Sequence, residues 1–156
     1  MTLLAETLEK YGFTLRSGNA VGADQAFAYG VETKADIWLP WPTFNREFRK
    51  VKPHHNYIEM SSDDTDADAS VNIYHPKGAS LGPKSRQFMA RNFRQIIGLD
   101  EPNSEFVIAW TPDGREVGGT SQALRIANKH NISIVNMFGC MSAQQVIDYL
   151  AIFNEL

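Results

Sequence analysis

The chain has 156 residues, of which 43% are hydrophobic and 21% charged, and these fractions are typical of one globular domain spanning residues 1–156 rather than of a disordered or fibrous chain. A net charge of −3 argues against a broadly basic surface for nucleic acid. The single cysteine, Cys140, excludes an intramolecular disulfide, and no apolar run reaches the roughly 20 residues of a membrane span. We expect a cytoplasmic protein of a bacterium or of a phage-infected cell.

The first third of the chain alternates helical and extended patterns. Apolar residues at helical spacing predict a helix over residues 2–11 and another over 22–33. Residues 13–17 and 37–39 read as short strands. Residues 40–56 hold three prolines and clustered basic residues, and this composition predicts an ordered loop, with His54 and His55 on its surface.

The same alternation continues to the C-terminal end. Helices are predicted up to His75 and from Pro83 to Gly98, and the aspartates at 63–68 read as a solvated helix start. Residues 106–110 form the clearest buried strand, followed by a polar turn over 111–118, a helix over 120–130 and a strand over 132–135. Ser142 and Gln145 form a capping box for a last helix. Strands alternating with amphipathic helices predict an α/β fold, a mostly parallel sheet with helices on its faces.

The first candidate site is the turn Ser17-Gly18-Asn19-Ala20-Val21-Gly22-Ala23-Asp24, which leads from a strand into a helix. A helix start presents unpaired backbone N–H groups and a partial positive charge, and small residues let a phosphate approach them. Asp24 lies in the first turn of that helix, where it either caps the helix or accepts a hydrogen bond from a ribose hydroxyl. Taken alone, this turn is better explained as a tight connection without a ligand, because two glycines in a turn are a weak signal.

The second candidate site, Gly118-Gly119-Thr120-Ser121, has the same position between a strand and a helix and adds two hydroxyl donors. Parallel strands place their carboxyl ends on one edge of the sheet, where ligands bind in a crevice. We therefore expect both turns to face the same crevice, which favours phosphate binding over two unrelated tight turns.

Five segments in order resemble a known family: residues 15–24 (LRSGNAVGAD), 39–41 (LPW), 90–93 (ARNF), 110–114 (WTPDG) and 118–120 (GGT). They are similar to the SLOG superfamily of Rossmann-like domains, and within it to the small phage and bacterial proteins related to DNA-processing protein A. The similarity covers most of the chain from Gly12 to Met137. It implies a Rossmann-like three-layer sandwich and a nucleotide-related ligand in the crevice.

The two turns and the resemblance together give the candidate ligand-binding residues: Ser17, Gly18, Asn19, Ala20, Gly22, Asp24, Arg91, Asn92, Trp110, Thr111, Gly118, Gly119, Thr120 and Ser121. Arg91 is singled out by its family position from a basic helix side that also carries Lys84, Arg86 and Arg94, which are expected in solvent. We expect no metal site and no required cofactor beyond the nucleotide-type ligand, because the histidines lack metal-ligand spacing and the aspartates lack a calcium-loop pattern.

The sequence departs from the family pattern in three places. Asn19 replaces the second glycine of the first turn, and asparagine tolerates a left-handed backbone. Ala123 stands where the hydrolase branch carries its catalytic glutamate, so that Asp24 is the best remaining candidate for a catalytic carboxylate. Relatives begin with a strand and a Gly-Ser-Arg turn, and this sequence starts at the helix that follows, so the usual first strand is missing.

These observations leave four functions open. The first is a protein that binds a nucleotide or nucleotide-derived ligand without turnover, and the missing glutamate favours it. The second is an enzyme that hydrolyses or transfers at the N-glycosidic bond of a nucleotide. The third is a single-stranded DNA binder with a role in recombination, which the acidic net charge weakens. The fourth is a structural homo-oligomer with a vestigial site, in which another chain completes the sheet.

Overall fold

The computed structural model describes residues 1–33, 35–115, 118–138 and 142–152. Its helices are α1 (Thr2–Lys10), α2 (Ala23–Gly30), α3 (Arg46–Val51), α4 (Thr65–Tyr74), α5 (Pro83–Ile97), α6 (Gly118–Lys129) and α7 (Ala143–Ile152), with short 3₁₀ turns at Gly78–Ser80 and Pro112–Gly114. Its strands are β1 (Arg16–Ser17), β2 (Asp36–Leu39), β3 (Asn56–Glu59), β4 (Phe106–Ala109) and β5 (Ser133–Asn136). The predicted α/β class with parallel strands is confirmed.

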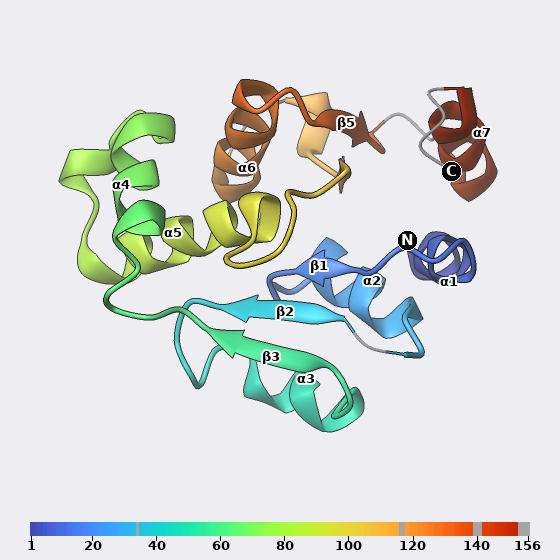
Figure 1. Ribbon diagram of the computed structural model, residues 1–156, viewed down its shortest axis with the longest axis horizontal. Coiled ribbons are helices and arrows are strands. Elements are labelled where there is room, and N and C mark those ends of the chain that lie inside the picture. The colour runs from blue at the N-terminus through green and yellow to red at the C-terminus, as the bar shows by residue number, and fades with distance from the viewer. Residues whose placement is uncertain (34, 116–117, 139–141, 153–156) are drawn as a thin grey trace.

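The described strands form two separate parallel sheets. One has the order β1-β2-β3 and the other pairs β4 with β5. In Figure 1 the first sheet and α1 to α3 lie on one side of the molecule, β4, β5 and α6 lie on the other, and α5 runs between them. Within the described residues no strand joins β1 to β4, so the predicted single sheet is divided at this point.

The segment predicted as a loop, residues 40–56, is more regular than expected. It contains α3 and leads directly into β3, which the sequence pattern did not reveal. Asn45 precedes α3 with φ +44°, a left-handed backbone that asparagine tolerates. β3 has a half-buried pattern and is defined by pairing with β2, for example Tyr57 beside Ile37, so long-range contact decides its conformation.

The hydrophobic core lies between the first sheet and the terminal helices. Leu4 and Leu8 of α1, Phe27 of α2, Ile37 of β2 and Val146 of α7 belong to one buried cluster. The capping box of α7 forms as predicted: the Ser142 amide donates to Gln145 Oε1 at 2.7 Å, and the Gln145 amide donates to Ser142 Oγ at 3.2 Å. A second cluster joins α5, α6 and β5.

Two arginines of α5 that were expected in solvent instead tie this helix to α4. Arg94 is buried and donates to both carboxylate oxygens of Asp64, at 2.7 and 2.6 Å. Asp64 is also the N-cap of α4 and accepts from the Ala67 amide at 3.1 Å. Arg86 pairs with Asp68 nearer the surface. The acidic segment is therefore a docking site for α5, and it fixes the helix that carries Arg91 and Asn92.

Candidate functional site

The first glycine turn is held to the loop after β2 by Asn19. Its side chain is fully buried and donates to the carbonyls of Phe44 at 3.1 Å and Asn45 at 3.3 Å. The Asn45 side-chain amide in turn donates a hydrogen bond to the Asn19 backbone carbonyl at 2.8 Å. Asn19 has φ +59°, the left-handed conformation for which the family pattern uses glycine. Asn19 therefore has a structural role in the turn, alongside any role toward a ligand.

Asp24 closes the same turn from the first turn of α2. Its Oδ2 accepts from the Ala20 amide at 3.1 Å, and the Ser17 hydroxyl donates to the Asp24 carbonyl at 3.4 Å. Gly22 precedes α2 with φ +108°, where a side chain would be strained. One backbone N–H that a phosphate could use is thus already satisfied by the chain itself.

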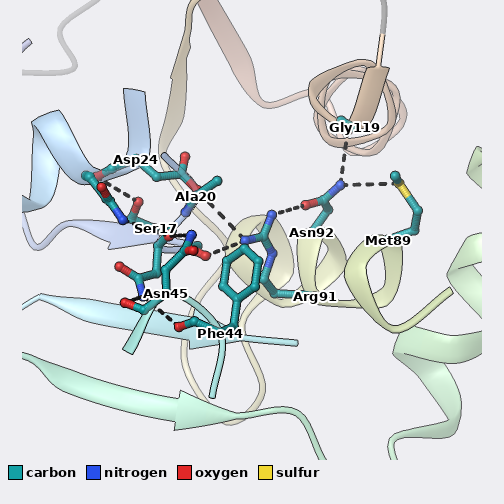
Figure 2. A network of polar contacts seen from close by, with 12 residues as sticks. Ser17, Ala20, Asp24, Phe44, Asn45, Met89, Arg91, Asn92 and Gly119 are labelled. Atoms are coloured by element: carbon teal, nitrogen blue, oxygen red, sulfur yellow. Dashed lines mark hydrogen bonds and ion pairs between the residues drawn. The ribbon is translucent and has the colours of Figure 1, made fainter. Parts of the chain in front are cut away.

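Arg91 reaches this turn from α5 and is the most unusual group of the site (Figure 2). Its side chain is 4% exposed and donates to the Gly18 carbonyl and, at 3.1 Å, to Asn92 Oδ1. Its guanidinium carbon lies 4.4 Å from the centre of the Phe88 ring. Among the residues that the structure describes, Asp24 is the one carboxylate paired with it, at 3.9 Å.

The charge of Arg91 is incompletely compensated. Burial lowers the pKa of its guanidinium, and the Asp24 carboxylate opposes this shift. Arginine nevertheless stays protonated in proteins, so the site holds a buried cation. Its Nε is buried without a hydrogen-bond partner among the described groups. A Cβ at Gly18 would lie 2.3 Å from Arg91 Nη1 and 2.9 Å from Asp24 Oδ2, so a larger residue here would displace this pair of side chains.

The second glycine turn is joined to the first through Asn92. The Asn92 amide donates to the Gly119 carbonyl at 3.0 Å and to Gln122 Oε1 at 3.2 Å. Gly118 starts α6 with φ +67°, and Ser121 Oγ donates to its carbonyl at 2.8 Å. Arg91 and Asn92, adjacent on α5, therefore bring the two turns together, as Figure 2 shows.

Both turns border one cavity of about 580 Å³ between β1 and β4, so the expectation of a shared crevice is confirmed in the geometry. The predicted residues that line it are Ser17, Ala20, Asp24, Arg91, Asn92, Trp110, Gly119 and Thr120. The predicted residues that do not line it are Gly18, Asn19, Gly22, Thr111, Gly118 and Ser121. These six lie in the supporting structure; Thr111, for example, is buried and accepts from Asn136 Nδ2 at 2.7 Å.

Three site residues were missed from the sequence. Phe88 stacks on Arg91, and its position three residues earlier on the same helix could have suggested this contact. Gln122 is fully buried beside Asn92, and Phe44 contributes both a ring near Arg91 and a carbonyl to Asn19. The last two contacts join segments far apart in the chain, which no local pattern reveals.

No model of a known protein family, no curated protein and no solved structure matches this chain. Among the described helices, none is long and apolar enough to cross a membrane. The described residues also hold no group of three His, Cys, Asp or Glu side chains arranged for a metal ion.

Proposed function

We propose that this protein binds a nucleotide or nucleotide-derived phosphate ligand, without turning it over, at the end of the cavity bordered by the two glycine turns. The observation that carries the proposal is Arg91, a buried cation that lines the cavity with a single carboxylate at 3.9 Å. A buried charge that is only partly compensated is costly, and a bound anion would add compensation. The N-terminal end of α6 adds the helix dipole on the other side of the same space.

The position of Asp24 supports binding over catalysis. Its carboxylate oxygen is engaged by the Ala20 amide and faces Arg91, so it closes the turn. A general acid or base needs a reacting atom within hydrogen-bond reach, and the resemblance to the SLOG superfamily assigns that role to a glutamate where this chain has Ala123. The N-glycosidase alternative predicts release of free base from a bound nucleotide.

The first experiment is native mass spectrometry of the purified protein, followed by thermal shift with a panel that includes ADP-ribose and cyclic dinucleotides. A ligand from this panel is then titrated calorimetrically into the wild type and the Arg91→Gln variant. Loss of a charge-assisted hydrogen bond costs about 1.5–3 kcal/mol, so affinity should fall roughly 10- to 150-fold. Arg86→Gln is the matched control, because Arg86 lies on the same helix outside the cavity.

A second pair of variants tests the location of the site. Gly119→Val places a branched side chain on the cavity wall, where a Cβ would already lie 3.1 Å from the Phe88 ring. Gly82→Val is the control, since a Cβ at Gly82 meets nothing within 4 Å and Gly82 lies away from the cavity. If binding survives Gly119→Val, the ligand site lies elsewhere. If chromatography of the recovered ligand shows free base, the protein is a hydrolase.

A further inference from the structure

Trp110 is a half-exposed tryptophan on the wall of the cavity. It directly follows Ala109, the last residue of β4, and 47% of its surface is exposed. The other two tryptophans are used by the fold: Trp38 of β2 is buried, and the Trp41 ring packs edge-to-face on Phe44 with ring centres 5.2 Å apart. In the described part of the chain, no aromatic ring or cation packs on the Trp110 indole.

The position of Trp110, more than its exposure, makes it a candidate for ligand contact. Single exposed apolar side chains are common on protein surfaces and need no explanation. Trp110 differs because the same cavity is lined by Gly119 and Thr120 at the start of α6 and by the buried cation Arg91 on α5. A ligand that fills this cavity therefore meets a positive charge and a flat aromatic face.

The rest of the lining suits a ligand that is both flat and polar. Gln95, Asn103 and Thr120 add amide and hydroxyl groups to walls that also carry apolar side chains. Such groups donate and accept hydrogen bonds, and a purely apolar ligand would bury them at a cost. The cavity volume of about 580 Å³ lies within the range of roughly 300–1,000 Å³ that is usual for small-molecule sites.

We propose that the ligand carries a nucleobase, and that this base stacks on Trp110 while the phosphate lies toward Arg91. This inference rests on the proposed nucleotide-binding function and names the part of the ligand that the phosphate site does not recognise. Every base has a π-face, so one indole accepts purines and pyrimidines alike. A sugar phosphate without a base leaves the indole in water and therefore binds more weakly.

The test is calorimetric titration of the full chain with ADP-ribose, the four nucleoside 5′-monophosphates, adenosine and ribose 5-phosphate. The wild type should bind the best nucleotide at least about fivefold more tightly than ribose 5-phosphate, which lacks the base. Trp110→Ala should weaken that nucleotide about 5- to 150-fold, the range for loss of one base–aromatic stack, and leave ribose 5-phosphate unchanged. Trp110→Phe keeps a ring and should retain most of the affinity.

Phe138→Ala is the matched control. Phe138 is an aromatic residue that is 43% exposed just after β5, and it does not line the cavity, so its removal should leave binding unchanged. Fluorescence gives a second readout: the nucleotide should quench tryptophan emission in the wild type, and this quenching should be lost in Trp110→Phe although that variant still binds. Circular dichroism checks that each variant is folded.

The outcomes separate this proposal from the proposed phosphate site. Equal affinity of the wild type for every nucleotide and for ribose 5-phosphate, or equal losses from Trp110→Ala and Phe138→Ala, overturns stacking on Trp110 and leaves the phosphate site intact. If adenosine binds as tightly as AMP, depends on Trp110 and is unaffected by Arg91→Gln, the base stack is supported and the phosphate site is wrong. If no compound of the set binds at millimolar concentration, both proposals are overturned.

Discussion

Substitution of Asp64 tests whether the ion pair with Arg94 holds α5, and with it Arg91 and Asn92, in position. Both side chains are nearly buried, with 9% of Asp64 and 6% of Arg94 exposed. Asp64→Asn keeps an N-cap acceptor for α4 but removes the charge, and Asp64→Ala removes both. Arg94 would then remain a buried cation without its main carboxylate, although its bond to the Gly98 carbonyl at 2.6 Å is retained.

The expected cost follows from this burial. Removing one partner of a buried ion pair costs about 3–5 kcal/mol, and loss of an N-cap costs about 1 kcal/mol more. We therefore expect the free energy of unfolding to fall by about 3 kcal/mol in Asp64→Asn and by about 4 kcal/mol or more in Asp64→Ala. For a domain of this size, 3 kcal/mol corresponds to a fall in Tm of roughly 6–12 °C.

Urea unfolding followed by circular dichroism measures these differences, with Asp68→Asn as the matched control. Asp68 also pairs with an arginine of α5, but 56% of its side chain is exposed, so its loss should cost less than about 1 kcal/mol. Burial alone would raise the pKa of Asp64, but hydrogen bonds from Arg94 and from the Ala67 amide, with the Arg94 charge, lower it overall. The stability difference between wild type and Asp64→Asn should therefore shrink as pH falls below about 4. Equal costs for Asp64→Asn and Asp68→Asn would refute the reasoning.

Two further predictions concern positions away from the cavity. His55 is buried; its Nδ1 accepts from the Ala35 amide, and its Nε2 lies 2.8 Å from the Ala28 carbonyl oxygen. Burial lowers the pKa of His55, so the free energy of unfolding should decline as pH falls below about 6.5. Urea titrations should show that His55→Gln flattens this decline. Gly30→Ala would place a Cβ 2.3 Å from the Thr2 carbonyl oxygen, so α1 and α2 must move apart. The Tm should fall by several degrees, which corresponds to a loss of about 1–3 kcal/mol in the free energy of unfolding. An unchanged Tm would show that the two helices can separate without a loss of stability.

Local patterns predicted most elements of the fold because their signals are contained within a few residues. Pro83 and Gly98 bound α5 as expected, and the Ser142–Gln145 box starts α7. β3 was missed because its conformation depends on pairing with β2. His55 was expected on a loop surface but is buried, since neighbours distant in sequence satisfy both ring nitrogens.

The sequence predicted that the two glycine turns share one crevice, and residues of both turns line one cavity, although the site itself stays a prediction. The sequence could not separate lining residues from supporting ones: the Asn19 side-chain NH2 donates to the loop after β2, and the Thr111 hydroxyl accepts from Asn136, so neither side chain lines the cavity. Nor could it show that Arg91 would be buried with one carboxylate at 3.9 Å, because that depends on α5 meeting the first glycine turn and the loop that carries Phe44.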